Sequence, residues 1–383
     1  MIEMQDIIRN NRVWYCQECG KCSAVCPITQ WESQNFSSPR LLVTKAIDGG
    51  PAAVMEDPLF WTCLTCHRCS LLCPSNVYFS DFIRDVRTLA RAQGHSGECS
   101  HGQIVQTWGK MMTVSDLNQD RLAWISRGLN VSNDSEIIYF SGCLPYYDVL
   151  FGNLNFEGVK IARAAIKIMN HLGIAPQVMA HERCCGHDQL WQGDFETFRT
   201  LAKLNLEHLS ATGAKKIITT CPECAITLAR AYPKYIGEHG MEVLHISQFL
   251  IPALTDGSLV AGSRNAMRVT YHDPCRLGRH LGVFDEPRTL IRAFGFDLVE
   301  MERARQASLC CGTTGWSSCG RTSKNIQLER LQEAAHTGAQ LLVTACLKCQ
   351  IHFRCARSDP MLQDANDFEI QDLTTLIANQ LQT

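Results

Sequence analysis

The feature that most constrains this chain is its 21 cysteines among 383 residues. A chain of this length can bury more than one hydrophobic core, so it does not depend on disulfides for stability. The cysteine number is odd, and the first residues, MIEMQDIIRNNRVW, contain no apolar run and no small-residue cleavage site. We therefore expect no signal peptide, a cytoplasmic location, and thiols that bind metal rather than form disulfides.

The first two groups of cysteines share one spacing, C-x2-C-x2-C-x3-C-P, and end at Pro27 and Pro74. This is the spacing of two-cluster ferredoxins, in which three thiolates of a run hold one 4Fe–4S cube and the fourth crosses to the other cube. The proline turns the chain away after the fourth cysteine. The predicted ligands of one cube are Cys16, Cys19, Cys22 and Cys73, and those of the other are Cys63, Cys66, Cys69 and Cys26. A pair of four-cysteine zinc sites is the alternative.

The segments around these runs have helical patterns. Ser38 and Pro39 are typical of a helix N-terminus, and the glycines at 49 and 50 are typical of a helix end. Residues 80–94 have apolar side chains at helical spacing. We also expect Gly20 to let its loop wrap closely where a Cβ would clash. Residues 1–100 are therefore predicted to form an α-helical ferredoxin domain with two 4Fe–4S clusters.

The remaining cysteines reveal an internal repeat. The first copy has Cys143, then Cys184-Cys185-Gly186, then Cys221-x2-Cys224; the second has Cys275, then Cys310-Cys311-Gly312, then Cys346-x2-Cys349. Short apolar runs that suit buried strands precede the first and last elements of each copy: EIIYFSG and KKIITT, then MRVTYHDP and QLLVTA. Amphipathic stretches at 159–172, 195–209 and 322–335 supply further helices.

Strands that alternate with helices predict βαβ units with parallel sheets. The predicted fold class is therefore α+β / α/β, with the helical ferredoxin domain followed by two repeated α/β lobes at 135–260 and 265–383. A pseudo-twofold relation between the lobes would bring their cysteine-bearing strand ends to a shared cleft.

Each copy supplies five cysteines, whereas an ordinary 4Fe–4S cube uses four thiolates. A fifth ligand, with two ligands on adjacent residues, indicates a larger or opened cluster, or a thiolate that bridges two irons. A vicinal disulfide and a zinc site with a spare thiolate are the alternatives. Two complete copies beside a two-cluster ferredoxin favour iron–sulfur clusters.

From residue 10 to 355, the chain resembles heterodisulfide reductase. The repeat is similar to the paired cysteine-rich "CCG" domains of its catalytic subunit, and the N-terminal runs resemble its ferredoxin-like subunit. The segments HDPCRLGRH at 272–280 and RCCGHDQLWQGD at 183–194 also resemble it. Arg276 is a departure, because a histidine is expected after that cysteine.

The resemblance implies that each five-cysteine set holds a noncubane 4Fe–4S cluster and that the two clusters cleave a substrate disulfide between them. The implied ligands are Cys143, Cys184, Cys185, Cys221 and Cys224 in the first set, and Cys275, Cys310, Cys311, Cys346 and Cys349 in the second. Cys99, Cys319 and Cys355 are left over; we expect them to be buried and inert, with a supporting role near the second cluster as an alternative for Cys319.

Disulfide reduction also consumes protons, so His187 and His272 are candidate catalytic acids. The alternative is that each hydrogen-bonds a cluster sulfur or a carbonyl, the role also expected for His67. Four cations could attract an anionic substrate, or be solvated or paired within the fold: Arg183, Arg276, Arg279 and Lys348.

Two functions follow. In the first, electrons pass through the two cubes to the noncubane pair and reduce a disulfide. In the second, the chain is an electron-transfer subunit of a larger complex of benzoyl-coenzyme A reductase, sulfite-reduction or quinone-linked type. No G-x-G-x-x-G fingerprint is present, so a flavin-containing or other electron-donating subunit is the expected partner, with a membrane cytochrome as another. The formal charge of −2 argues against nucleic acid.

Overall fold

The computed structural model describes residues 3–32, 37–261, 267–359 and 368–381. The chain forms two compact units. The first contains Met1–Met111, Gly186–Phe198 and Leu309–Glu329; the second contains Met112–Cys185, Arg199–Ser308 and Arg330–Thr383. The segment that follows Cys184-Cys185 and the segment that contains Cys310-Cys311 thus group with the N-terminal helices. The predicted boundaries at 1–100, 135–260 and 265–383 stay predictions.

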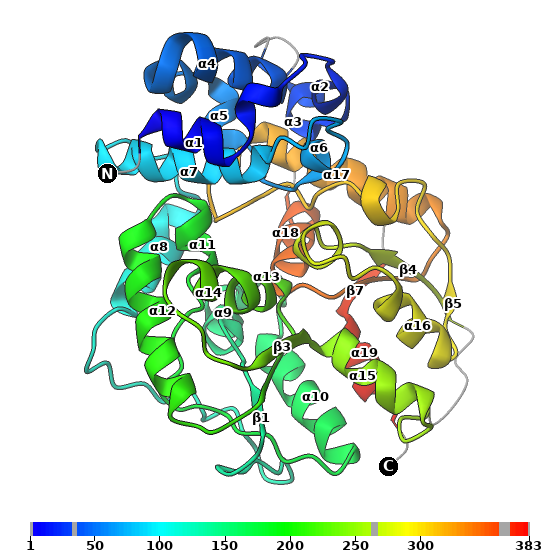
Figure 1. Ribbon diagram of the computed structural model, residues 1–383. Helices are drawn as coiled ribbons and strands as arrows, with labels where there is room; N and C mark the ends of the chain where they lie inside the picture. Colours follow the sequence, from blue (N-terminus) through cyan, green and yellow to red (C-terminus); the bar gives the residue numbers. More distant parts are fainter. Residues whose placement is uncertain (1–2, 33–36, 262–266, 360–367, 382–383) are drawn as a thin grey trace. The chain divides into compact units, whose positions relative to one another are not determined.

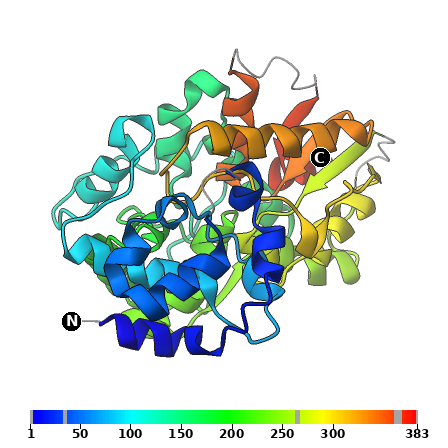
Figure 2. The same cartoon turned by 90° about the horizontal axis from the view of Figure 1, so that it is seen from above.

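The N-terminal part of the first unit is helical, as predicted, and is the blue to cyan part of Figures 1 and 2. Its α-helices are α1 (Met4–Asn10), α2 (Lys21–Val25), α3 (Pro27–Trp31), α4 (Pro39–Met55), α5 (Pro58–Thr62), α6 (Arg68–Leu71), α7 (Phe79–Ala92) and α8 (Ile104–Met111). Ser38 caps α4 by accepting a hydrogen bond from Leu41 N at 3.3 Å. Gly50 has φ +71° and interrupts α4, and Pro51 starts its last turns.

A buried arginine ties this unit together. Arg87 on α7 is 1% exposed, and its guanidinium donates to the carbonyl oxygens of Phe60, Trp61 and Cys63 at 2.8–3.0 Å. The same group donates to Trp191 O at 3.0 Å, on α11 (His187–Trp191). One side chain therefore fixes the backbone that leads into the second cysteine run. Hydrogen bonds from a charged donor are stronger than those from neutral ones.

The second unit contains two parallel sheets, one for each copy of the repeat. The first has the order β1-β2-β3, with β1 (Ile137–Tyr139), β2 (Lys216–Thr219) and β3 (Glu242–His245). The second has the order β5-β4-β6-β7, with β4 (Arg268–His272), β5 (Asp297–Leu298), β6 (Leu341–Thr344) and β7 (Glu369–Asp372). The mixed α/β prediction is confirmed.

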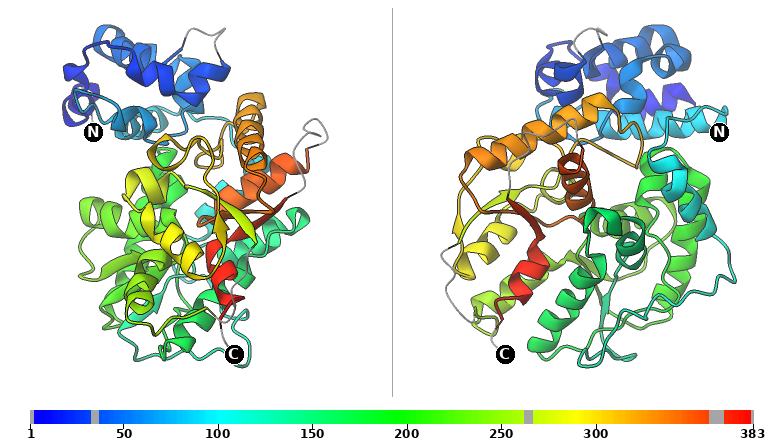
Figure 3. Two further views of the ribbon diagram at one scale, coloured as in Figure 1. Left: turned by 90° about the vertical axis from the view of Figure 1, so that its right-hand side faces the viewer. Right: turned by 180° about the vertical axis from the view of Figure 1, so that it is seen from behind.

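Two equivalent pairs of helices pack across the two copies of the repeat. In Figure 3, α10 (Gly158–His171) of the first copy packs against α19 (Leu373–Ala378) of the second. Correspondingly, α15 (Ile246–Thr255) of the first copy packs against α16 (Asp285–Ala293) of the second, as Figure 1 shows. Each copy thus covers the other with an equivalent helix, in agreement with the expected pseudo-twofold relation.

Candidate iron–sulfur sites

Four cysteines of the first unit line one small cavity: Cys26, Cys63, Cys66 and Cys69. They are the four residues that the sequence assigns to the second cube. Burial raises the pKa of Cys63 to about 12. Burial and the charges of Cys66, Cys63 and Cys26 raise the pKa of Cys69 well above its usual value. Four ionised thiols this close require cationic compensation, so the donor set fits thiolate-bound iron.

The other predicted cube ligands lie nearer the surface. Cys19 is exposed, and Cys16, Cys22 and Cys73 are half-buried. Burial raises the pKa of Cys22, and the charge of Cys16 adds to the effect. Helix α2, which carries Cys22, packs against α6, which ends just before Cys73. The Sγ of Cys73 accepts a hydrogen bond from Val77 N at 3.4 Å.

The two ferredoxin loops turn at equivalent positions. Gly20 has φ +75° and His67 has φ +67°, and each immediately precedes the short helix of its run. A Cβ at Gly20 would meet no described atom within 4 Å, so the expected clash is not with the protein. The left-handed backbone is what favours glycine here. The Nδ1 of His67 lies 3.3 Å from Ser80 Oγ, so this histidine anchors its loop to α7.

The second unit brings the complete first set together. The Sγ atoms of Cys143 and Cys184 lie 3.7 Å apart. A hydrogen bond with Cys184 raises the pKa of Cys185 well above its usual value. Cys224 is hydrogen-bonded to both Cys185 and Cys221, and its pKa is raised in the same way. All five thiols are buried. This chain of sulfur contacts fits a cluster with five thiolate ligands.

The parallel strands explain why these cysteines meet. Tyr139 of β1 pairs with Ile218 of β2, and Cys143 and Cys221 follow at the carboxyl ends of the two strands. Gly142, with φ +60°, makes the turn before Cys143, and a Cβ there would lie 2.9 Å from Cys224 Sγ. Glycine is therefore required both for the backbone conformation and for space.

A buried ion pair that the sequence did not reveal holds the Cys143 loop. Arg121 and Glu182 are both 0% exposed and form a hydrogen-bonded pair. Glu182 also accepts from Ser141 N at 3.2 Å and from Gly142 N at 2.7 Å. Burial raises the pKa of Glu182 to about 7, although Arg121 opposes the shift. The pair joins the loop before Cys143 to the segment before Cys184.

The backbone of the vicinal pair is fixed by two further polar side chains. Asn205 lies on α12 (Phe195–Ser210); its Oδ1 accepts from Arg183 N at 2.8 Å, and its Nδ2 donates to Cys184 O at 3.0 Å. The hydroxyl of Tyr232 donates to Cys185 O at 3.2 Å. Asn205 and Tyr232 are hydrogen-bonded to each other at 3.0 Å. These residues have no sequence signature, because their partners are main-chain atoms distant in sequence.

The second set is divided between the units. Cys310 and Cys311 belong to the first unit, and Cys275, Cys346 and Cys349 belong to the second. Within the second unit, His272 of β4 pairs with Thr344 of β6, so Cys275 and Cys346 leave the same ends of adjacent strands. A hydrogen bond with Cys349 lowers the pKa of Cys346. Burial and the charges of Glu223 and Cys221 outweigh this effect, so the pKa of Cys346 is raised above its usual value.

The two C-x2-C motifs are linked directly. Lys348, between Cys346 and Cys349, has its Nζ 2.9 Å from the carboxylate of Glu223, which lies between Cys221 and Cys224. The side chains of both residues are largely buried, with 4% and 12% exposed. In addition, α13 (Pro222–Ile226) packs against the π-helical turn η6 (Arg276–His280) that follows Cys275. Within this unit, the C-x2-C motifs of the two cysteine sets are therefore joined by a direct side-chain contact.

The four candidate substrate-binding cations have partners inside the fold. Arg183 donates to Ser115 O at 3.2 Å, and Arg279 donates to Ser308 O at 2.6 Å. The Nη1 of Arg276 lies 2.6 Å from His280 Nε2, and Lys348 pairs with Glu223. These contacts agree with the structural interpretation that the sequence left open.

The candidate acids differ in their surroundings. His187 is buried on α11, with Nδ1 3.3 Å from the Asp188 carboxylate. His272 accepts a hydrogen bond from Arg330 Nε at 3.1 Å through Nδ1. Burial, with Arg330 and Arg279, lowers the pKa of His272 well below its usual value. A neutral His272 is therefore favoured. Proton donation by His187 or His272, and the alternative of a hydrogen bond to a cluster sulfur or a carbonyl, stay predictions.

The three left-over cysteines are half-buried and not fully buried as expected: Cys99, Cys319 and Cys355. Among the described residues, no helix combines the length and apolar character needed to cross a membrane.

The fold and the sites define a class of protein. A family model described as a 4Fe-4S dicluster domain matches residues 10–77, and one described as a cysteine-rich (CCG) domain matches residues 137–229 and 269–354. The chain belongs to the family of iron–sulfur proteins that combine an N-terminal 4Fe-4S dicluster domain with two CCG domains. The matched residues include every cysteine assigned above to a cluster.

Individual relatives narrow the class to oxidoreductase components. A polypeptide of the dihydromethanophenazine:CoB–CoM heterodisulfide reductase of Methanosarcina barkeri is 31% identical over 271 residues, which are 69% of this chain and 63% of that protein. A polypeptide of the CoM/CoB fumarate reductase of Methanothermobacter marburgensis is 27% identical over 97% of this chain and 74% of that protein. EtfAB:quinone oxidoreductase of Syntrophomonas wolfei is 30% identical over 56% of this chain and 30% of that protein.

Proposed function

We propose that this chain is the disulfide-reducing component of a multisubunit redox complex. Electrons from a flavin-containing or other electron-donating partner, or from a membrane cytochrome, enter through the two 4Fe–4S cubes. They then pass to two noncubane 4Fe–4S clusters, held by the two five-cysteine sets. Such clusters supply one-electron transfer and iron that can bind sulfur.

The observation that carries the proposal is the Glu223–Lys348 pair. It joins the C-x2-C motif of one set to that of the other at 2.9 Å. A disulfide has two sulfurs, each of which becomes a thiolate when the bond breaks, so two adjacent metal sites match the product. The overall reaction takes two electrons and two protons for each S–S bond and releases two thiols.

The protein's own residues organise this reaction. The Arg121–Glu182 pair and Gly142 set the path of the Cys143 loop, and Asn205 fixes the backbone of Cys184. Arg87 fixes the backbone at Cys63 in the ferredoxin region. Fixed ligand positions reduce the structural change that accompanies electron transfer.

An electron-transfer role without a disulfide substrate is the second candidate. It is favoured by the similarity to EtfAB:quinone oxidoreductase, a relative whose name refers to a quinone and not to a disulfide. The chain spans 63% of the length of the heterodisulfide reductase polypeptide of Methanosarcina barkeri. Because the match is partial, the disulfide substrate is part of the proposal.

Stopped-flow mixing separates the two candidates. Anaerobically purified, dithionite-reduced protein is mixed with coenzyme-derived and other mixed-thiol disulfides, and cluster reoxidation is followed by absorbance. Disulfide reduction predicts saturable reoxidation and release of two thiols per disulfide. Reoxidation by a quinone-linked partner complex, with none by any disulfide, would overturn the proposal and leave the electron-transfer role.

A further inference from the structure

In the first unit, large apolar side chains are exposed next to the cysteines of the first cube, the one assigned to Cys16, Cys19, Cys22 and Cys73. Four of these side chains form what we call the apolar rim: Trp14, Tyr15, Leu71 and Leu72. The first two are 53% and 62% exposed and directly precede Cys16; the last two are 42% and 48% exposed and directly precede Cys73. Exposed apolar side chains are common singly, but a group of them at one site marks an interaction surface.

The two parts of the rim belong to segments that pack together. Leu71 ends α6, which packs against α2, the helix that starts two residues after Cys19. Tyr78 is also exposed, and its N–H donates to Asn11 O at 3.0 Å. This bond joins the segment after the second cysteine run to the chain just before the 3-10 turn η1 (Val13–Tyr15). The rim is therefore grouped around the loop that carries the exposed Cys19.

The second cysteine run shows that the fold does not require these exposed side chains. Trp61 stands at the position equivalent to Trp14, two residues before the first cysteine of its run. Trp61 is half-buried, and the guanidinium carbon of Arg87 lies 5.8 Å from the centre of its ring. Ala24 stands at the position equivalent to Leu71. The large exposed groups are thus a property of the segments beside the first cube.

The two cubes differ in how closely an external donor can approach them. Cys19, a predicted ligand of the first cube, is exposed, whereas Cys63 and Cys66, predicted ligands of the second, are buried. The rate of electron transfer falls steeply with distance, so the exposed cube is the one that an external donor reaches. We propose, on the basis of the function above, that the apolar rim binds the electron-donating subunit and that electrons enter at the first cube.

The charge around the rim indicates the kind of partner. Residues 3–32 contain three bases and four acids, and residues 67–85 contain two of each. These segments therefore have no strong net charge of either sign. Diffusing electron carriers are steered by complementary charge, whereas stably associated subunits bury an apolar centre. The rim fits a subunit that stays bound through an apolar face close to its own flavin, haem or iron–sulfur group, and not a charged ferredoxin that diffuses.

The native complex, purified anaerobically through an affinity tag on this chain, tests the proposal. We expect a subunit with a flavin, haem or iron–sulfur group to co-purify and to stay bound from low salt to about 0.5 M salt. The double variant Trp14→Gln with Leu71→Gln should retain at least about tenfold less of this subunit, because large apolar contacts of the interface are lost. The matched control is Ile104→Gln with Met111→Gln, at two exposed apolar side chains on α8 of the same unit, and should retain the subunit fully.

Electron paramagnetic resonance of the dithionite-reduced double variant shows whether its ferredoxin region is folded, because both cube signals should match those of the unaltered chain. Tyr78→Gln changes a third exposed side chain of this surface, so it reports on retention of the subunit even if the double variant folds poorly. It should also weaken retention relative to the control.

Equal retention of the subunit by the rim variants and the control would overturn the proposal. So would release of the subunit by about 0.5 M salt, co-purification of only a second copy of this chain, or the lack of any co-purified subunit with a redox group. Disulfide reduction by dithionite-reduced protein bypasses the partner subunit. Its failure alone would leave the apolar rim as a binding surface, and failure of the rim variants to release the subunit would leave disulfide reduction untouched.

Discussion

Lys348 and Glu223 form a buried ion pair, 2.9 Å between Nζ and carboxylate, and each lies between the cysteines of a C-x2-C motif. The pair is a direct side-chain link between the two copies at their ligand loops. Removal of one member deprives the other of this opposite charge in a buried position, whereas removal of both removes the pair as a whole. A single substitution should therefore destabilise the protein more than the double substitution does.

We predict that Lys348→Met lowers the free energy of unfolding by about 3 kcal/mol. The double variant Lys348→Met with Glu223→Gln should recover part of this loss. Thermal melting of the four proteins of this double-mutant cycle measures the coupling. Purely additive effects would contradict a direct interaction between the two side chains.

Replacement of one ligand should affect one region only. Cys185→Ser should alter the signal of the first five-cysteine cluster and leave the two ferredoxin cubes intact, because the cube ligands lie elsewhere in the chain. Electron paramagnetic resonance and iron content provide the readout; the intact protein should hold about 16 irons. Cys355→Ser, a half-buried cysteine outside both sets, is the matched control. Loss of the cube signals in Cys185→Ser would refute the separate assignment.

The sequence predicted the parts of the sites that depend on spacing. The two ferredoxin runs, the cysteine repeat and the apolar strands before Cys143 and Cys275 are periodic or repeated, so they can be recognised without coordinates. Cys26, Cys63, Cys66 and Cys69 line one cavity. The crossed assignment of ligands to the two cubes stays a prediction.

The supporting residues could not be predicted in the same way. Arg87, Glu182 and Asn205 each bind main-chain atoms of segments distant in sequence. Nothing in the residues around them marks such contacts, which depend on how helices and loops pack. For the same reason, the sequence could not show whether Arg279 binds a substrate or is paired within the fold. Its partner, Ser308 O, lies 29 residues further along the chain and is identified only in the structure.

Gly142 provides a test of the first set's geometry. Gly142→Ala places a Cβ 2.9 Å from Cys224 Sγ and imposes a left-handed φ on alanine. The strained backbone alone should cost about 1 kcal/mol. The contact should also displace Cys224 and change the spectrum of the first cluster. Gly173→Ala is the control, since Gly173 has φ +73° but a Cβ there meets no atom within 4 Å of the described structure. Equal spectra for the two variants would contradict the predicted displacement.

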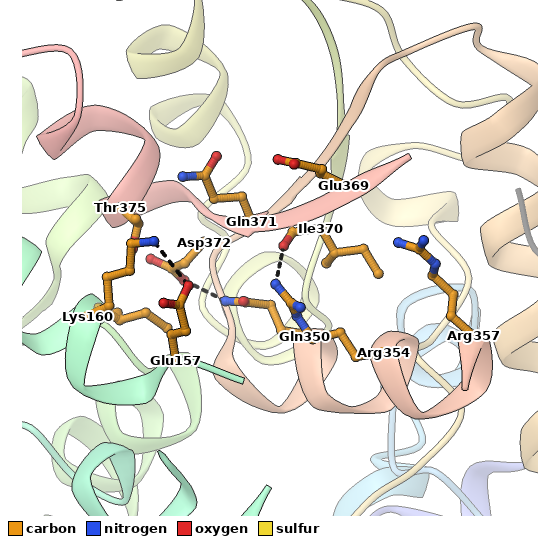
Figure 4. Close-up of a pocket in the computed structure, with 11 residues that line it drawn as sticks. Glu157, Lys160, Gln350, Arg354, Arg357, Glu369, Ile370, Gln371, Asp372 and Thr375 are labelled. Carbon is orange, nitrogen blue, oxygen red and sulfur yellow. Dashed lines mark hydrogen bonds and ion pairs between the residues drawn. The ribbon is translucent and has the colours of Figure 1, made fainter. Parts of the chain in front are cut away.

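Asp372 should make stability depend on pH. Its pKa is raised from 3.8 to about 7 by burial, so the folded state retains a proton that the unfolded chain releases above pH 4. The folded state is therefore favoured at low pH, and this advantage is lost as the pH rises towards 7. The neighbouring groups are Tyr139, Tyr271 and Gln350. Glu157, Lys160 and Arg354 line the same cavity as Asp372 (Figure 4).

Asp372→Asn removes this titration and keeps a side chain that can cap α19. The wild type should gain stability relative to the variant as the pH is lowered from 8 to 6, by on the order of 1 kcal/mol. Thermal melting of both proteins across this range, at constant ionic strength, provides the measurement. Asp256→Asn, at an exposed carboxylate, is the control and should not change the slope. Parallel pH profiles for wild type and Asp372→Asn would show that Asp372 is ionised in the folded protein throughout this range.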